Sequence, residues 1–110
     1  MKRLALILMA LASLVASGPS ATAQAAPRQF TVIMDNMVFG RLPADAKVGD
    51  TILWVNRDSV EHSATARDGT FDLRLQPGRS GRTVLRKAGS IAIYCVMHPM
   101  MRATLKVAAR

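Results

Sequence analysis

One short stretch near the end of the chain carries three side chains that can bind a soft metal ion. Cys95, His98 and Met101 follow one another at three-residue intervals and offer a thiolate, an imidazole and a thioether. Met100 offers another thioether, and residue type alone leaves open which of the two methionines binds. The other histidine is His62, much earlier in the chain. Two imidazoles, a thiolate and a weak thioether form the donor set of a blue-copper site, which cycles between Cu(II) and Cu(I).

These donors can meet only if the segments that carry them fold side by side. Short apolar stretches recur between turn signals such as Asp68-Gly69 and Pro77-Gly78, and no stretch has the pattern of an amphipathic helix. The pattern predicts an all-β sandwich or barrel. The expected strands cover residues 30–34, 51–56, 60–66, 80–86, 90–95 and 101–107.

Strand periodicity predicts where two of the donors point. Cys95 is expected at the end of a strand, on the same inward face as Ile93. In the strand 60–66, alternation places Val60 and His62 on one face. The strand ends that carry His62 and Cys95 can then meet at one end of a sandwich.

The first 26 residues have the pattern of a cleaved secretory signal peptide. Lys2 and Arg3 precede an apolar run over 4–15, and a Gly18-Pro19 break and several small residues follow. Cleavage is expected after one of three alanines: Ala23, Ala25 or Ala26. The domain 27–110 is then expected in a bacterial periplasm. Its single cysteine cannot form an intramolecular disulfide, and a free thiol in that oxidising compartment is a liability unless a metal occupies it.

Length and charge exclude several classes of protein. A chain of 110 residues fits one domain. The net charge of +8 is spread along the chain without a dense Lys/Arg block, so we expect no nucleic-acid partner. No apolar run reaches the roughly 18 residues of a membrane span, so we expect no membrane insertion. No nucleophile–base pair or paired carboxylates stand out, and four protein donors leave no open position on the metal, so we expect no enzyme.

The sequence resembles the cupredoxin family, the blue-copper proteins of the amicyanin, plastocyanin and pseudoazurin group. The resemblance lies in 51–58 with the following Val60-Glu61-His62, and in 92–95 through His98-Pro99 to Met101. It implies a Greek-key β-sandwich with one type 1 copper ion at one end. Carried over by position, His62, Cys95 and His98 are the strong equatorial ligands, and Met101 is the axial ligand.

The sequence departs from the family at two places. The segment between His62 and Cys95 is short, which implies a trimmed strand or loop. Met97 precedes His98, where amicyanin-like sequences usually have proline. The methionine bears on the fine geometry of the site and its reduction potential more than on the identity of the metal.

The resemblance implies a monomeric periplasmic electron carrier. Its donor would be a dehydrogenase or similar enzyme, and its acceptor a c-type cytochrome or oxidase. The edge of His98, flanked by Met97, Pro99 and Met100, is implied as an apolar docking patch, and Arg67 or Arg102 is a hypothetical basic rim. The alternatives are a protein for copper delivery or resistance, suggested by the sulfur-rich loop, and a metal-free binding module.

Residues beside the expected ligands have expected roles too. Ser63 is expected to hydrogen-bond the Cys95 sulfur through its N–H or its hydroxyl. Asn56 and Asp58 either tie the His62 loop together or are turn residues. Trp54, on an apolar strand, is expected in the core.

Overall fold

The computed structural model describes residues 5, 7, 9–18 and 25–110. Within them the chain forms strands and no helix. The strands are β1 (Gln29–Asp35), β2 (Val38–Phe39), β3 (Ala46–Lys47), β4 (Thr51–Asn56), β5 (His62–Ala66), β6 (Asp72–Leu75), β7 (Ser80–Val84), β8 (Gly89–Tyr94) and β9 (Arg102–Ala108). The described part thus has no helix that is long and apolar enough to cross a membrane.

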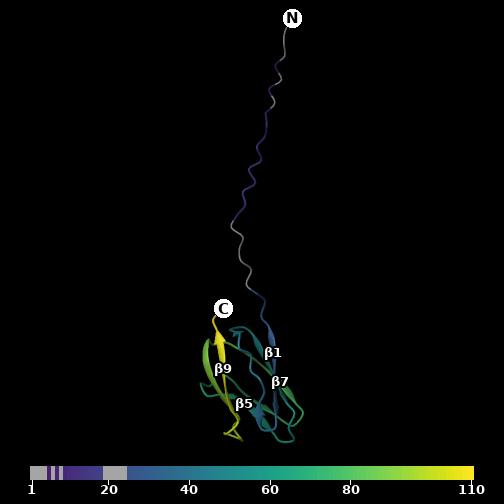
Figure 1. The fold of residues 1–110 in the computed structure, drawn as a ribbon, viewed down its shortest axis with the longest axis vertical. Helices are drawn as coiled ribbons and strands as arrows, with labels where there is room; N and C mark the ends of the chain where they lie inside the picture. Colours follow the sequence, from purple (N-terminus) through teal and green to yellow (C-terminus); the bar gives the residue numbers. More distant parts are fainter. Residues whose placement is uncertain (1–4, 6, 8, 19–24) are drawn as a thin grey trace.

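The strands form two sheets that pack as a sandwich (Figure 1). One sheet has the order β2-β1-β4-β7, and the other has the order β3-β9-β8-β5-β6. Neighbouring strands are antiparallel except for β1 with β4 and β3 with β9. Since consecutive strands repeatedly lie in different sheets, the chain closes the sandwich by crossing between them. The predicted all-β sandwich is confirmed.

Trp54 occupies the centre of the core, as expected. Its side chain is fully buried, and its indole nitrogen donates a hydrogen bond to the Thr83 hydroxyl at 2.9 Å. The Phe39 ring meets it edge-on, with the ring centroids 5.9 Å apart, and Phe71 packs at 6.1 Å. The indole is therefore packed between aromatic rings while its N–H stays paired with a neighbouring strand of its own sheet.

The sequence pattern misplaced the start of β5 and missed three short strands. β5 begins at His62, and Val60 is 41% exposed instead of facing the core. β2 and β3 have two residues each, too few to show a pattern, so their pairing in the sheets defines them. β6 alternates polar and apolar residues, and this signal was missed. Both faces of β5 are buried. Ser63 and Thr65 lie opposite the core-facing alanines, and burial of their hydroxyls is tolerated because these are hydrogen-bonded.

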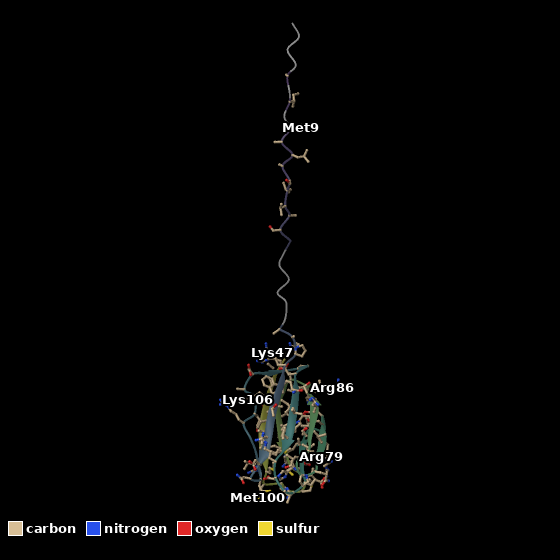
Figure 2. The ribbon with its side chains drawn as sticks, turned by 90° about the vertical axis from the view of Figure 1, so that its right-hand side faces the viewer. Met9, Lys47, Arg79, Arg86, Met100 and Lys106 are labelled. Atoms are coloured by element: carbon tan, nitrogen blue, oxygen red, sulfur yellow. The ribbon has the colours of Figure 1, made fainter. Side chains whose placement is uncertain are left out.

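The two ends of the sandwich differ in character. Figure 2 places Lys47 at the end nearest the N-terminal segment and Met100 at the opposite end. At the first end, the buried Asp50 carboxylate accepts hydrogen bonds from the Arg28 N–H at 2.8 Å and the Lys47 N–H at 2.9 Å. It also pairs with the Arg110 guanidinium at 2.7 Å. Asp50 therefore fastens both termini of the domain to one buried charge.

The N-terminal segment stands apart from the sheets. Residues 9–18 form neither helix nor strand, and their apolar side chains, such as Leu11 and Leu14, are about nine-tenths exposed. Figure 1 shows this segment running away from the domain. Of the expected cleavage positions, Ala25 and Ala26 are exposed, and Ala23 lies outside the described residues. The signal peptide stays a prediction.

Candidate metal centre

Three of the four expected ligands meet at one end of the sandwich. One ligand atom each from His62, Cys95 and His98 can be chosen so that all three lie within 4.8 Å of one another. The Cys95 sulfur is 3.8 Å from Nδ1 of His62 and 3.5 Å from Nδ1 of His98. His62 and Cys95 are fully buried, whereas His98 is half-buried. The structure therefore builds a compact, sulfur-containing donor set from two separate parts of the chain.

These distances suit a single metal ion. A four-coordinate ion with a metal–sulfur bond of about 2.3 Å and a metal–nitrogen bond of about 2.0 Å separates those two donor atoms by about 3.5–3.8 Å. Both sulfur–nitrogen distances, to His62 and to His98, fall at this spacing. The sulfur can thus share one ion with both imidazoles without a large rearrangement of the backbone.

The loop 95–101 holds its donors through hydrogen bonds within its own backbone. The Cys95 N–H donates to the Met101 carbonyl at 2.9 Å, which extends the ladder between β8 and β9 by one step. The Met101 N–H donates to the His98 carbonyl at 2.8 Å, and the His98 N–H donates to the Cys95 carbonyl at 3.2 Å. A tight turn therefore fixes the three-residue spacing that the sequence displays.

Ser63 joins the two halves of the site where strands β5 and β8 separate. Their ladder includes Ala66 with Ile93 and Thr65 with Tyr94, and it stops there. Beyond that point the Ser63 N–H donates to the Cys95 sulfur at 3.3 Å. This confirms the expected contact and assigns it to the backbone N–H. The structure gives the hydroxyl a different role.

The Ser63 hydroxyl belongs to a polar chain that the sequence did not reveal. Its oxygen accepts a hydrogen bond from the Val96 N–H at 2.8 Å and lies 2.8 Å from the Thr65 hydroxyl. The Thr65 hydroxyl in turn donates to Asp72 at 2.8 Å. The alternation of Ser63 and Thr65 along one strand was the available signal, because two hydroxyls on one face can bond to each other. This series of hydrogen bonds fixes the backbone of Val96, the residue that follows Cys95.

Asp58 orients the His62 ring. Its carboxylate lies 2.7 Å from Nε2 of His62 and accepts backbone hydrogen bonds from Asn36 at 2.8 Å and Met37 at 2.9 Å. The hydrogen bond with His62 is the main cause that lowers the pKa of Asp58 to about 2, and the Met37 and Asn36 N–H groups add to it against the effect of burial. An ionised carboxylate only accepts hydrogen bonds, so Nε2 of His62 carries the proton. Nδ1 is then free to face the sulfur.

Asn56 supports the same loop from within. Its amide nitrogen donates to the carbonyls of Val60 at 2.8 Å and Leu75 at 3.1 Å, and its side-chain oxygen accepts from the Asp58 N–H at 2.9 Å. Asn56 is fully buried. Of the two readings that the sequence left open, the structure supports the one in which Asn56 and Asp58 tie the His62 loop together.

The methionines of this region differ sharply in exposure. Met101 is 3% exposed, and Met100 is 95% exposed. Met101 is therefore buried one ladder step from Cys95, whereas Met100 faces solvent. Met97 packs against the core, and its sulfur is 3.6 Å from a guanidinium nitrogen of Arg74.

The surface around His98 is an apolar hollow of about 430 Å³. It is lined by Met37, His98, Pro99, Met100 and Met101. Met97, which the sequence placed in the apolar patch, does not line this hollow. Met37 does, and it comes from the turn that follows β1. Arg67 and Arg102 line another hollow, where the Arg67 guanidinium lies 4.1 Å from the centre of the Tyr94 ring. Neither arginine lines the hollow at His98, and the basic rim stays a prediction.

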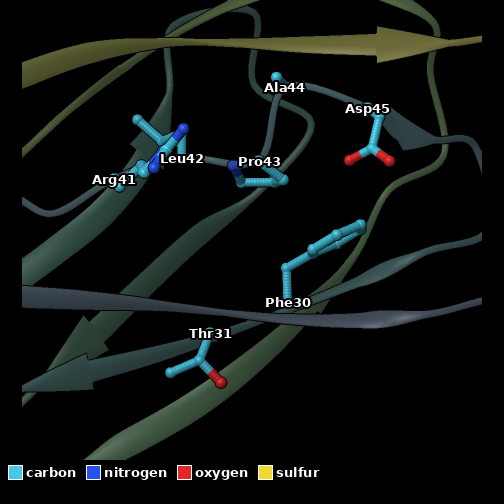
Figure 3. A pocket seen from close by; sticks show the side chains of 7 residues that line it. All are labelled: Phe30, Thr31, Arg41, Leu42, Pro43, Ala44 and Asp45. Atoms are coloured by element: carbon cyan, nitrogen blue, oxygen red, sulfur yellow. The ribbon is translucent and has the colours of Figure 1, made fainter.

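A third hollow, of about 440 Å³, lies far from these donors in the sequence and contains no sulfur or imidazole (Figure 3). Its lining residues are Phe30, Thr31, Arg41, Leu42, Pro43, Ala44 and Asp45. None of them is a soft metal ligand. In the described residues, the cluster of His62, Cys95 and His98 is the group of such side chains that can hold a metal.

Comparison with known proteins agrees with this geometry. No family model matches the chain. It is 37% identical to methylamine utilization protein MauL of Methylorubrum extorquens over 90 residues, which cover 78% of this chain and 79% of MauL. It is 26% identical to amicyanin of Paracoccus denitrificans over 102 residues, which cover 87% of this chain and 78% of amicyanin.

Solved structures give the same result for the fold. A reduced-state structure of an amicyanin mutant matches with a TM-score of 0.63 and 25% identity, over 72% of this chain and 81% of amicyanin. An oxidized-state structure of another amicyanin mutant matches with a TM-score of 0.61 and 26% identity, over 72% of this chain and 81% of amicyanin. Given the identity to MauL, the shared fold and the His-Cys-His cluster, the chain belongs to the cupredoxins, which are copper-containing electron-transfer proteins and not enzymes.

Proposed function

We propose that this protein is a type 1 copper electron carrier whose ligands are His62, Cys95, His98 and Met101. The observation that carries the proposal is the convergence of the Cys95 sulfur and the two histidine Nδ1 atoms at 3.8 and 3.5 Å. A thiolate, two imidazoles and a weak thioether are the ligands of blue-copper electron-transfer sites. When bound, copper supplies the one-electron couple between Cu(II) and Cu(I).

The chain's own residues keep the site rigid. The backbone bonds of loop 95–101 hold Cys95 and His98, and Asp58 holds the His62 ring. The Ser63 N–H donates a hydrogen bond to the Cys95 sulfur. Such a bond adjusts the reduction potential of a copper–thiolate site. Because the ligands are fixed before and after transfer, little reorganisation is needed. Rigidity of this kind favours fast exchange of single electrons.

The half-buried His98 gives the proposed route to a partner. Its ring reaches the apolar hollow that Met100 and Pro99 border, so a partner can approach the ligand directly. A small apolar contact suits a weak and short-lived redox encounter. We propose a dehydrogenase or similar donor and a c-type cytochrome or oxidase as acceptor, with the protein acting as a monomer. The name of MauL, a methylamine utilization protein, supports a donor that takes part in the use of a small amine.

The proposed location is the periplasm. The supporting feature is the N-terminal pattern over 1–26, in which basic, apolar and small residues follow in the order of a signal peptide. The domain after cleavage would be 27–110. Cys95 is a free, buried cysteine. In an oxidising compartment such as the periplasm, binding to a metal would protect its thiolate.

Copper delivery is the second candidate function. The observation that favours it is the thioether-lined hollow beside His98, which contains the exposed Met37 and Met100. A carrier must hold copper in both oxidation states, whereas a delivery protein prefers one state and gives up the ion. The two functions therefore differ in the affinity for Cu(II) relative to Cu(I).

The deciding experiment is the visible and EPR spectrum of the protein after Cu(II) is added, compared with Cys95→Ser. We expect an intense thiolate-to-copper band and narrow hyperfine splitting, both absent from the variant. Ser59→Ala, an exposed substitution outside the site, is the matched control. A weak d–d spectrum, or oxidation of Cys95 with loss of copper, would contradict the carrier and favour delivery or a metal-free role.

A further inference from the structure

The hollow beside His98 presents two thioethers to solvent. Met100 is 95% exposed and Met37 is 42% exposed, although the two lie far apart in the sequence. Both line the same hollow, of about 430 Å³, with His98 and Met101. His98 and Met101 also belong to the proposed buried site, so the hollow and that site share two residues.

Met37 is held in a backbone conformation that disfavours methionine. Asn36 has a φ of 53° and Met37 a φ of 60°, both in the left-handed region. Asparagine tolerates this region, but a residue such as methionine is strained there, and glycine is the usual choice for the second position of such a turn. The Asp58 carboxylate stabilises the turn by accepting both backbone N–H groups. Observed strain of this kind points to a use for the side chain.

Simple apolarity does not account for the choice of side chain. A docking patch needs apolar area, which leucine provides as well as methionine does. A thioether adds a soft, uncharged sulfur that binds Cu(I) without first losing a proton. We propose that Met37 and Met100 form an entry site that captures Cu(I) and passes it to the buried site through His98 and Met101.

This inference rests on the proposed copper site as the destination of the ion. Cu(I) leaves the thioether sulfurs of Met37 and Met100 with no change in its oxidation state. At the buried site the Cys95 thiol releases its proton to water as the copper–sulfur bond forms. The net change is the movement of one Cu(I) ion and the release of one proton, and no oxidant or reductant is needed.

Met97 provides a matched control within the same loop. It does not line the hollow, and its sulfur faces the Arg74 guanidinium at 3.6 Å. A cationic neighbour opposes the binding of another cation. Loss of the Met97 sulfur should therefore leave Cu(I) capture unchanged, although its position in the sequence makes it as plausible a ligand as Met100.

The first test uses Ag(I), a redox-inert probe for Cu(I), added to the Cu(I)-loaded protein with methyl-labelled methionines. We expect one Ag(I) to bind beside the resident copper by native mass spectrometry, and the NMR signals of the Met37 and Met100 methyl groups to shift. The Met97 signal should stay in place. Absence of shifts at Met37 and Met100, or an equal shift at Met97, overturns the proposal.

The second test measures how fast the copper-free protein takes Cu(I) from a bicinchoninate complex. The double variant Met37→Leu/Met100→Leu keeps the apolar area but lacks both sulfurs, and we expect loading to slow by about tenfold. The Met97→Leu control should load at the wild-type rate. After oxidation, all three proteins should show the same spectrum.

The outcomes separate this inference from the proposed function. A wild-type protein without the intense copper–thiolate band contradicts the proposed function. A wild-type protein with the band, together with a double variant that loads at the wild-type rate, overturns the entry site alone. In that case the hollow serves only as a contact surface.

Discussion

Asp58 determines which nitrogen of His62 is available to a metal. The carboxylate lies 2.7 Å from Nε2, so that nitrogen keeps the proton, and Nδ1 faces the Cys95 sulfur at 3.8 Å. The same carboxylate holds the Asn36–Met37 turn. One side chain therefore connects a proposed ligand to the rim of the surface hollow. Hydrogen bonds of this kind raise the basicity of a ligand and fix its orientation.

Replacing Asp58 by alanine should weaken copper binding. Removing a hydrogen-bond partner of a metal-bound histidine typically costs about 10–100-fold in affinity, because the ring is no longer held in one tautomer and orientation. The measurement is competition for copper against a chelator of known affinity. Asp45→Ala is the control, since Asp45 is exposed and pairs with Arg28. Equal affinities of the Asp58 and Asp45 variants would contradict the prediction.

Replacing Met101 by leucine should raise the reduction potential while the intense copper–thiolate band remains. The axial thioether donates electron density to copper, and its loss disfavours Cu(II) relative to Cu(I). Met100→Leu, at a position that is 95% exposed, should leave the potential unchanged. Voltammetry of the two variants measures the difference. A shift in Met100→Leu but not in Met101→Leu would reverse the assignment.

Replacing Asp50 by asparagine should destabilise the domain by about 3 kcal/mol at neutral pH, because the Arg110 guanidinium loses its buried partner. Urea unfolding of the copper-free protein measures the change in free energy. Asp45→Asn, which alters an exposed ion pair, should change the stability by less than about 1 kcal/mol. Similar losses in the two variants would show that the buried ion pair has no special role.

The same residue predicts a dependence of stability on pH. Burial alone raises the pKa of Asp50, but hydrogen bonds from the Arg28 and Lys47 N–H groups and the charge of Arg110 outweigh it and lower the pKa below its ordinary value of 3.8. The ionised carboxylate thus stabilises the fold above pH 3.8, and this contribution is lost as the pH falls through the lower folded-state pKa. Asp50→Asn should be less sensitive to acid below pH 3.8. Parallel unfolding curves against pH would contradict this.

Replacing Ser63 by alanine should lower the stability by about 1–3 kcal/mol, because the Val96 N–H and the Thr65 hydroxyl both lose a partner. The copper–thiolate band should persist, since the N–H that reaches the Cys95 sulfur belongs to the backbone. Thermal unfolding and the visible spectrum measure the two effects. Ser59→Ala, at an exposed position, should alter neither. Loss of the band in Ser63→Ala would show that the hydroxyl contributes directly to the site.

Local pattern in the sequence determined the fold class and half of the site. The apolar stretches between turns predicted an all-β sandwich or barrel, because a strand that packs against a second sheet must bury one face. Cys95 and His98 could be grouped with a nearby methionine from spacing, because the seven residues 95–101 form a tight turn that keeps the ends of the segment together. The two-residue strands β2 and β3 escaped detection, since their identity depends on their neighbours in the sheets.

The tertiary structure decided what spacing could not. It placed Nδ1 of His62 beside Cys95 because β5 and β8 are neighbours in one sheet. It buried Met101 and exposed Met100, which adjacent positions in the sequence could not distinguish. It also brought Met37 to the surface hollow next to His98, a partner for which the sequence held no signal. Such contacts join residues far apart in the chain, so only the packing of the two sheets fixes them.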